Sequence, residues 1–273
     1  MNIVADLGGS RMRFAEVTKG ELGKPHIIKT PDVYEEAIVQ AGEVITQIIS
    51  ESDATDKVVH FCVCGVAGVL NEESSQLLVS PNLQSWVGKP LQKDLSRMMG
   101  ARVILKNDTD MTGLGEAVYG AGKNNSIVAY LTFSTGIGGS LIIDGDIGKY
   151  SLGYEPGFQI VDVEQKKFLH DVSGSALKKE HDSLFKDISD GATRNHIMRY
   201  VIGGIHNTIV YWSPDIVVIG GGMTESFDIE QISYSLENMR FKLPKLPKIV
   251  LAHDTDTNGL YGGLAYLQKH FGK

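Results

Sequence analysis

The chain reads Val103-Ile104-Leu105-Lys106-Asn107-Asp108 at the point where a short apolar strand should end and a glycine-dotted helical segment, 111–122, should follow. Two glycine-rich turns flank this point in the sequence, Asp6-Leu7-Gly8-Gly9-Ser10-Arg11 and Ser134-Thr135-Gly136-Ile137-Gly138-Gly139. A carboxylate on a rigid strand end between two clusters of backbone amides suits phosphoryl transfer, because that reaction depends on positioning the reactants and neutralising charge. This pattern predicts a kinase that acts on a hydroxyl group.

Composition and charge limit the class of protein and its partners. With 273 residues, of which 42% are hydrophobic, the chain can bury a large core, and we expect two lobes that share a cleft. The net charge of −7, a pI near 5.6 and the lack of a Lys/Arg run argue against nucleic acid as a partner and favour small molecules. The sequence begins on an expected strand, 2–5, with no basic leader and no apolar span of membrane length, so we expect a cytoplasmic protein without membrane contact.

Only two cysteines occur, Cys62 and Cys64, within the apolar run 58–66. Strand alternation places both side chains on one face, where a buried pair of reduced thiols is the simplest interpretation. A metal or redox role is disfavoured, because the spacing is not CxxC and no third ligand lies near in the sequence.

Alternating strand and turn signals in the first thirty residues predict an antiparallel meander, followed by a helix that starts at Thr30-Pro31. The expected elements up to residue 121 are strands 3–5, 12–17 and 26–28 with a break at 20–25, helix 32–50, strand 58–64, helix 91–99, strand 102–105 and helix 110–121. The succession of strand, glycine turn and strand then recurs at 127–143, which we interpret as an internal duplication at the level of the fold. The remaining expected elements are helix 194–212, strand 216–219, helix 225–240, strand 249–251 and a terminal helix from 258.

The first glycine turn joins two strands, so a plain hairpin is its simplest interpretation. Its functional interpretation is a phosphate site, because Gly8 and Gly9 let backbone amides approach an anion while Ser10 and Arg11 add donors. Asp6, at the strand end, suits a hydrated magnesium ion held against the phosphates. The chain has no GxxxxGK[ST] motif, so a P-loop enzyme is disfavoured.

The second glycine turn, with Ser134, Thr135, Gly136 and Gly138, also joins two strands, whereas a dinucleotide fingerprint needs a helix after it. Two such turns can grip the phosphates of one nucleotide. The run Gly220-Gly221-Gly222 after an apolar strand is either an ordinary strand-to-helix turn or a flat surface for an adenine ring and its ribose.

Asn107 and Asp108 have two interpretations. Both residue types are common helix caps, and Thr109 and Asp110 compete for that role. In the functional interpretation Asp108 is the base that accepts the proton of the attacking hydroxyl, and Asn107 binds the same sugar. Glu155 is likewise either an exposed acid in a turn or an acceptor for vicinal sugar hydroxyls.

Together these motifs resemble, in the same order along nearly the whole chain, those of the ROK family (repressor, open reading frame, kinase) of bacterial sugar kinases. Besides the two phosphate turns, the matching stretches are Gly65-Val66-Ala67-Gly68, Ser80-Pro81-Asn82-Leu83-Gln84-Ser85-Trp86, Asn107-Asp108 through Gly120-Ala121-Gly122, and 214–223.

The resemblance implies an α/β chain with the two-lobed ribonuclease-H-like fold of actin-like ATPases and hexokinases, and a sugar and ATP cleft between the lobes. The N-terminal lobe is expected at 1–110, completed by the helix 258–273, and the C-terminal lobe at 111–257. Asp108 is then the catalytic base of a kinase that uses ATP and Mg²⁺ to phosphorylate the 6-OH of glucose or a related hexose. A homodimer is also expected. The implied sugar-binding residues are Gly65, Ala67, Asn82, Asn107, Asp108 and Glu155. The implied ATP- and magnesium-binding residues are Asp6, Gly8, Gly9, Ser10, Arg11, Ser134, Thr135, Gly136, Gly138, Gly220, Gly221 and Gly222.

One departure from the family pattern concerns zinc. The family usually has a histidine after its sugar-binding glutamate and then a cysteine-rich zinc segment, but here Phe158 holds the histidine position and 163–172 contains no cysteine. Tetrahedral zinc needs ligands that this stretch lacks, so we predict no zinc. Leu169 stands at the position of a second sugar-binding glutamate. The alternative to a kinase is therefore a catalytically weak sugar- or nucleotide-binding module, while DNA binding is disfavoured because the family's repressors begin with a helix-turn-helix.

Overall fold

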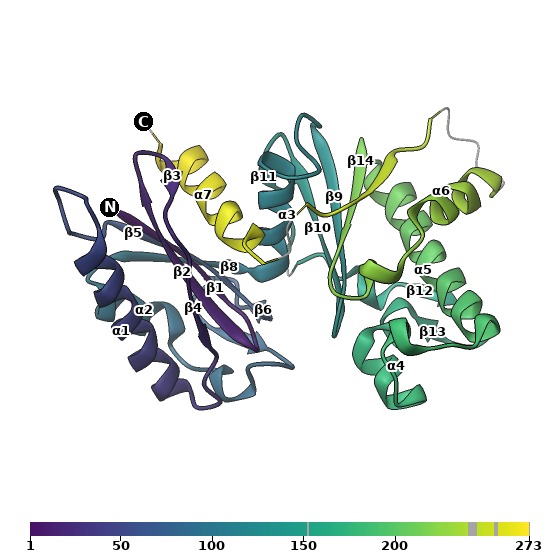
Figure 1. Cartoon of the computed structure of the whole chain (residues 1–273), viewed down its shortest axis with the longest axis horizontal. Coiled ribbons are helices and arrows are strands. Elements are labelled where there is room, and N and C mark those ends of the chain that lie inside the picture. The colour runs from purple at the N-terminus through teal and green to yellow at the C-terminus, as the bar shows by residue number, and fades with distance from the viewer. Residues whose placement is uncertain (152, 240–244, 254–255, 273) are drawn as a thin grey trace. The chain divides into compact units, whose positions relative to one another are not determined.

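The computed structural model describes residues 1–151, 153–239, 245–253 and 256–272, and the chain divides into two compact units. The first unit contains Met1–Gly115, Lys149–Gly153 and Asp256–Lys273, and the second contains Glu116–Gly148 and Tyr154–Thr255 (Figure 1). Within the described ranges, no helix is both long and apolar enough to cross a membrane.

The first unit is built on one mixed sheet with the strand order β3-β2-β1-β5-β8, and β4 also pairs with β2. Its strands are β1 (Asn2–Leu7), β2 (Arg11–Thr18), β3 (Glu21–Leu22), β4 (His26–Lys29), β5 (Phe61–Val66) and β8 (Arg102–Asn107). The β1–β2 pair is antiparallel, whereas β1, β5 and β8 run parallel. The carboxyl ends of β1, β5 and β8 therefore meet at one edge of the sheet.

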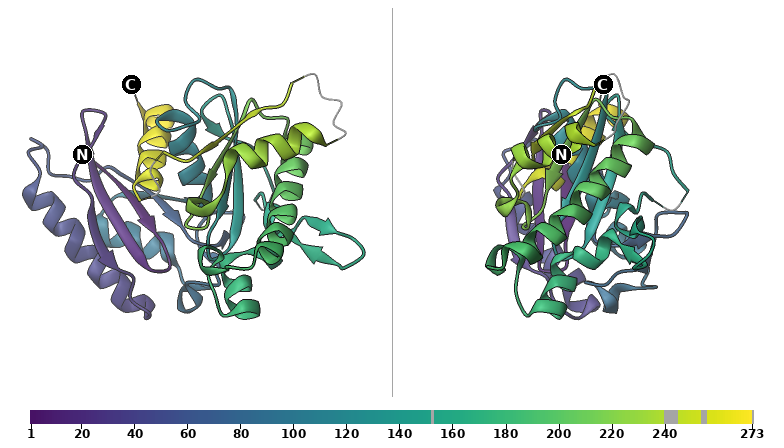
Figure 2. Two further views of the ribbon diagram at one scale, coloured as in Figure 1. Left: turned by 45° about the vertical axis from the view of Figure 1, so that its right-hand side comes forward. Right: turned by 90° about the vertical axis from the view of Figure 1, so that its right-hand side faces the viewer.

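Helices cover both faces of this sheet. Helices α1 (Tyr34–Glu51) and α2 (Leu91–Met99) pack on one face, and α7 (Asn258–Phe271) packs against β1 and β5 on the other (Figure 1; Figure 2, left). Strand alternation sends Cys62 and Cys64 to the α1 and α2 face, as predicted, with their sulfur atoms 3.4 Å apart and buried. The segment between β5 and α2 contains a small antiparallel pair, β6 (Val69–Leu70) and β7 (Leu77–Val79), and the short helix η1 (Gln84–Trp86).

Helix α3 (Asp108–Val118) follows β8 directly and crosses α7 at very short range. A Cβ on Gly262 would lie 1.8 Å from the Met111 carbonyl oxygen, and one on Gly115 would lie 2.2 Å from the Asn258 carbonyl oxygen. Such distances exclude any side chain at either glycine, because a real Cβ cannot come so close to backbone. The glycines thus let the two helices touch and fix the start of α3 at the strand ends.

The second unit repeats the sheet of the first, with the order β11-β10-β9-β14-β15. Its strands are β9 (Ile127–Phe133), β10 (Ile137–Ile143), β11 (Asp146–Ile147), β14 (Ile216–Gly220) and β15 (Lys248–Leu251). Helices α4 (Gly174–His181), α5 (Gly191–Trp212) and α6 (Ile229–Asn238) enclose its core with the short helices η2 (Pro156–Phe158), η3 (Leu169–Val172), η4 (Phe185–Asp187) and η5 (Thr224–Ser226). The hairpin β12 (Ile160–Asp162) and β13 (Lys167–Phe168) projects from this unit (Figure 2, left).

Most expected elements are present, and the differences have local causes. Helix α1 begins at Tyr34, and its N-cap Val33 has no polar atom with which to cap it. The Thr30 hydroxyl, expected at the start of this helix, donates to the Gly8 carbonyl instead. The predicted break at 20–25 contains the short strand β3, and strand β5 starts three residues later than the predicted 58 and includes Val66. Helix α6 is shorter than predicted, since Asp228 caps it and it ends at Asn238; residue 240 lies outside the described residues.

The second glycine turn is tighter than the sequence indicated. Strand β10 already begins at Ile137, so Gly138 and Gly139 lie within the strand, and the turn contains only residues 134–136. Gly139 has a packing reason to be glycine, since a Cβ there would lie 2.7 Å from Pro156 Cγ.

Candidate active site

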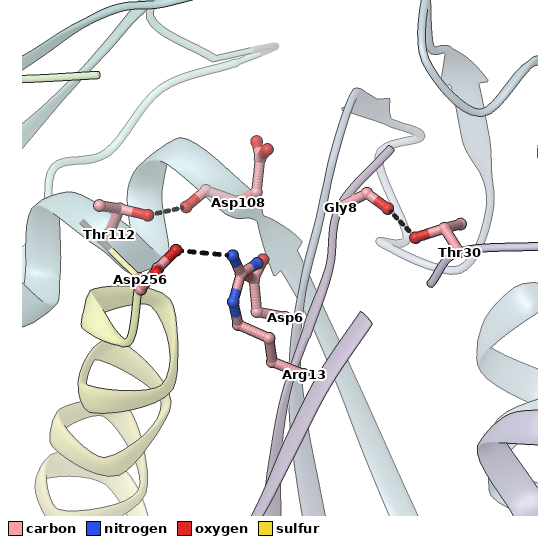
Figure 3. A network of polar contacts seen from close by, with 7 residues as sticks. All are labelled: Asp6, Gly8, Arg13, Thr30, Asp108, Thr112 and Asp256. Atoms are coloured by element: carbon pink, nitrogen blue, oxygen red, sulfur yellow. Dashed lines mark hydrogen bonds and ion pairs between the residues drawn. The ribbon is translucent and has the colours of Figure 1, made fainter. Parts of the chain in front are cut away.

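Asp108 lies where β8 ends and α3 begins, at the carboxyl edge of the first sheet. Its Oδ1 accepts a hydrogen bond from the Thr109 backbone N–H at 2.8 Å, and its carbonyl oxygen accepts one from the Thr112 hydroxyl at 2.9 Å (Figure 3). Strand β5 packs closely against this turn, because a Cβ on Gly65 would lie 3.2 Å from the Met111 Cγ and 3.4 Å from the Asp108 Cα. The start of α3 is therefore held in place by its own first turn and by the neighbouring strand.

The pKa of the Asp108 carboxyl is raised to about 6. Burial is the largest cause and the like charge of Asp6 is the second, while the hydrogen bonds from Thr109 act in the opposite direction. A carboxyl with this pKa is mostly ionised at neutral pH and is more basic than an ordinary aspartate. It is thus suited to accept a proton in a reaction.

Asn107 is bonded within the protein at both ends of its amide. Its Nδ2 donates to the Gly68 carbonyl at 2.9 Å, and its Oδ1 accepts from the backbone N–H groups of Thr109 at 2.8 Å and Asp110 at 3.2 Å. These bonds are those of a helix cap, which was one of the two interpretations of this residue. They also join α3 to the loop that leaves β5, and the sugar-binding role of Asn107 stays a prediction.

The first glycine turn is secured by Thr30, a residue whose role the sequence analysis missed. The Thr30 hydroxyl donates to the Gly8 carbonyl at 2.6 Å (Figure 3). The Thr30 N–H donates to the Ser10 carbonyl at 3.1 Å. Gly9 has a steric reason to be glycine, since a Cβ there would lie 2.4 Å from the Asn82 Cβ. The predicted phosphate turn and the predicted sugar residue Asn82 are therefore neighbours.

The Asp6 carboxylate is paired with Arg13. The Arg13 Nη1 lies 3.0 Å from Asp6 Oδ2, and its Nη2 lies 3.0 Å from Asp256 Oδ1 (Figure 3). Burial raises the pKa of Asp6, and the nearby positive charge of Arg13 opposes that rise. Neither Arg13 nor Asp256 was predicted from the sequence, and Arg11, which was predicted, is exposed.

The remaining predicted sugar residues of the first unit lie around the same strand ends. Gly65 is opposite Asp6 in the parallel β1–β5 pair, and the Ala67 N–H donates to the Leu7 carbonyl at 3.2 Å. A cavity of about 450 Å³ opens beside the glycine turn, and its lining includes Gly9, Thr30, Asn82 and Trp86. Of the predicted residues, Gly9 and Asn82 line this cavity, whereas Gly65 and Ala67 are paired with the end of β1.

The second glycine turn lies against the start of α4. The N–H groups of Gly174 and Ser175 donate to the carbonyls of Ser134 at 2.8 Å and Thr135 at 3.0 Å. A cavity of about 480 Å³ adjoins this contact, a size typical of small-molecule sites. Its lining includes Ser134, Thr135, Ser175, Lys178, Phe185 and Gly222. Ser175, Lys178 and Phe185 were not predicted from the sequence, because no local motif marks them.

The three glycines at the end of β14, of which Gly220 is the last strand residue, have different environments. A Cβ on Gly220 would lie 2.6 Å from the Tyr130 hydroxyl oxygen, and one on Gly221 would lie 2.4 Å from the Phe133 carbonyl oxygen. Gly221 also has φ +94°, a left-handed conformation that favours glycine. Only Gly222 has no neighbour within 4 Å of an added Cβ, and it lines the cavity. The turn interpretation therefore explains the first two glycines, and Gly222 alone offers a free surface.

Glu155 is exposed and immediately precedes η2 in the second unit. Phe158, at the histidine position of the family pattern, is 61% exposed and stacks on the His170 ring at 5.7 Å. Leu169, at the position of the second glutamate, is fully buried, and a Cβ on Gly204 would lie 2.5 Å from its Cδ2. Leu169 is therefore a core residue and not a sugar ligand. Among the described residues, no group of three or more His, Cys, Asp or Glu side chains could hold a metal ion, and the absence of zinc stays a prediction.

Comparison with known proteins identifies the family. Glucokinase of Thermotoga maritima is 24% identical over 234 residues, which cover 71% of this chain and 72% of that protein. The crystal structure of the ROK hexokinase from Thermus thermophilus covers 98% of both chains with a TM-score of 0.82 and 23% identity. A ROK family glucokinase from Streptomyces griseus, in complex with glucose and AMPPNP, covers 97% of this chain and 98% of that chain with a TM-score of 0.76 and 20% identity. These likenesses show the predicted actin-like ATPase fold, and because the family model matches residues 3–157, more than half of the chain, the protein belongs to the ROK family.

Proposed function

We propose that the protein is an ATP- and magnesium-dependent kinase that phosphorylates the 6-OH of glucose or a related hexose in the cytoplasm. The observation that carries this proposal is the Asp108 carboxyl, which stands at the end of β8 with its pKa raised to about 6, mainly by burial. The likeness to proteins named glucokinase and hexokinase supports the same reaction.

In the proposed reaction Asp108 accepts the proton of the sugar hydroxyl as that oxygen attacks the γ-phosphorus of ATP. The new O–P bond forms, the bond from the γ-phosphorus to the β,γ-bridging oxygen breaks, and ADP leaves with the electron pair. Gly65, Ala67, Asn82, Asn107 and Glu155 are proposed to bind the sugar, and the two glycine turns are proposed to bind the phosphates through their backbone amides.

The first unit offers a carboxylate, Asp6, of the kind that binds magnesium together with water and the phosphates of ATP. Mg²⁺ takes oxygen ligands, commonly one or two carboxylates completed by water and substrate phosphates. Asp6 offers such a carboxylate, with Oδ2 bound to Arg13. Asp6 would hold the ion, and the ion would neutralise negative charge on the donor phosphates.

A coupled assay of ADP release across hexoses and N-acetylated hexosamines tests the proposal. We expect one sugar to be turned over clearly faster than the others, and Asp108→Asn to lower kcat about 10²- to 10⁴-fold. Asp53→Asn is the matched control, because Asp53 is an exposed carboxylate of the same unit outside the site. Full activity of Asp108→Asn would exclude this residue as the base, and an absence of turnover on every sugar would refute the kinase.

The second candidate function is a sugar- or nucleotide-binding module with little catalysis. It is favoured by the buried Leu169 and by the exposed Phe158, which both stand where the family pattern has polar sugar ligands. Calorimetry separates the two functions. Tight sugar binding by a protein without measurable turnover would support the module.

A further inference from the structure

Arg13 is fixed in front of Asp6 by the backbone of the first hairpin. In the antiparallel β1–β2 pair, Asp6 and Arg13 are directly opposite each other, so their side chains stand on the same face of the sheet. On that face a Cβ on Gly259, at the start of α7, would lie 3.2 Å from the Asp6 Cγ. The carboxylate is therefore confined between Arg13 and helix α7.

The two ion pairs of Arg13 differ in their exposure to solvent. The side chains of Arg13 and Asp6 are 14% and 19% exposed, whereas that of Asp256 is 66% exposed. Water and salt screen an exposed pair strongly and a shielded pair much less. The pair with Asp6 is thus the stronger one, and Asp256 holds the other nitrogen of the guanidinium (Figure 3).

The guanidinium of Arg13 is oriented toward the two carboxylates, and this orientation leaves another of its nitrogens without a partner among the described residues. Its Nε is buried, and within the described part of the chain it has no hydrogen-bond partner. A buried donor without a partner costs free energy, so the orientation of the guanidinium satisfies the two carboxylates at the expense of Nε. This arrangement indicates that the main role of Arg13 is to neutralise the charge of the Asp6 carboxylate.

We propose that Arg13 is a positioning residue of the phosphoryl-transfer site: it holds the Asp6 carboxylate in one place and offsets its negative charge beside the phosphates of the donor. The inference rests on the proposed kinase function. Without Arg13, the Asp6 carboxylate would repel a bound triphosphate, and magnesium alone would have to overcome this repulsion. The loss should therefore be greatest when no metal is present.

Calorimetric binding of AMPPNP, measured with excess Mg²⁺ and again with EDTA, tests this inference without turnover. We expect Arg13→Met to weaken metal-free binding about tenfold and binding with Mg²⁺ only about two- to threefold. In the double variant Asp6→Asn/Arg13→Met, metal-free binding should return to within about threefold of the wild type, because no carboxylate remains to be offset. Arg13→Lys should keep most of the affinity, since it keeps the charge.

Arg97→Met is the matched control, because Arg97 makes a 3.1 Å ion pair with Asp94 on helix α2 of the same unit, with its side chain 76% exposed. It should bind AMPPNP as the wild type does in both conditions. The inference fails if Arg13→Met binds metal-free AMPPNP like the wild type, if the double variant stays as weak as the single one, or if Arg13→Lys is as weak as Arg13→Met. If Arg13→Met does not fold, the variants Arg13→Lys and Asp6→Asn provide the test. A tenfold loss of metal-free AMPPNP affinity in Arg13→Lys, or any loss of that affinity in Asp6→Asn, overturns the inference. A wild-type protein that binds AMPPNP but phosphorylates no sugar refutes the kinase alone, whereas one that binds no AMPPNP refutes both.

Discussion

The sheets of the two units share one order of five strands, and the strand residues just before the glycine turns pair in the same way. In the first unit, Asp6 on β1 lies opposite Arg13 on β2 and opposite Gly65 on β5. In the second unit, Thr132 on β9 lies opposite Gly138 on β10 and opposite Gly220 on β14. The backbone plan is shared, but an ion pair in one unit corresponds to a threonine and a glycine in the other.

This difference teaches which part of each site comes from the fold and which from the side chains. In both units the fold supplies a glycine turn at the carboxyl end of a parallel pair of strands. The first unit adds the charged side chains of Asp6, Arg13 and Asp108, which can take part in metal binding and proton transfer. The second unit has no carboxylate at the position that corresponds to Asp6, and the cavity beside its turn is lined by Ser134, Lys178 and Phe185. Proton transfer is accordingly expected in the first unit and nucleoside binding in the second.

The most direct test of this comparison replaces Asp6 with threonine, the residue at the corresponding position, 132, of the second unit. Asp6→Thr removes the carboxylate proposed to hold the metal ion, so we expect kcat to fall about 10²- to 10³-fold while the KM for sugar changes by less than about threefold. Steady-state kinetics with the best sugar of the panel measure both constants. A kcat within threefold of the wild type would show that the charge of the first turn has no part in the reaction.

The glycines of the second unit allow a test of its backbone. Gly221→Ala places a Cβ 2.4 Å from the Phe133 carbonyl oxygen at φ +94°, so we expect a loss of about 2–3 kcal/mol in stability and a fall in Tm of about 5 °C. Gly222→Ala is the matched control, because an added Cβ there has no neighbour within 4 Å. It should leave Tm unchanged and weaken only nucleotide binding. Equal Tm values for the two variants would contradict the assignment of Gly221 to the turn.

The sequence was sufficient for most elements, because apolar periodicity and the glycine turns are local signals, and the order of its motifs was sufficient for the resemblance that implied the fold. It was less informative about single side chains. Thr30 was expected to cap a helix, but its hydroxyl donates to the Gly8 carbonyl. Arg13 was missed because strand register decides that it faces Asp6, and register depends on the exact length of the turn. The cavity-lining residues Lys178 and Phe185 were missed because they reach Ser134 only through the folded chain.

The raised pKa of Asp108, a residue of the first unit, predicts that kcat/KM depends on pH. The base must be ionised, so kcat/KM should fall as the pH drops through about 6 and should be about tenfold lower at pH 5 than at pH 7. In Asp6→Asn the same decline should occur at lower pH, because the like charge that helps to raise the pKa of Asp108 is gone. Activity that is constant from pH 7 to pH 5 would exclude Asp108 as the titrating base.

The smallest expected effect concerns the cation of the second unit. Lys178 lines the cavity from helix α4 but is exposed, whereas Arg13 in the first unit is shielded in its pair with Asp6. Lys178→Met should therefore weaken nucleotide binding only about two- to fivefold at low salt, and the difference should vanish at about 0.5 M salt, because exposed charges are screened. Lys179→Met, the next residue on the same helix and outside the cavity lining, is the control and should bind like the wild type. A Lys178 effect that persists at high salt would mean that this lysine makes a shielded contact with the nucleotide, and the contrast between a shielded cation in one unit and a screened one in the other would no longer hold.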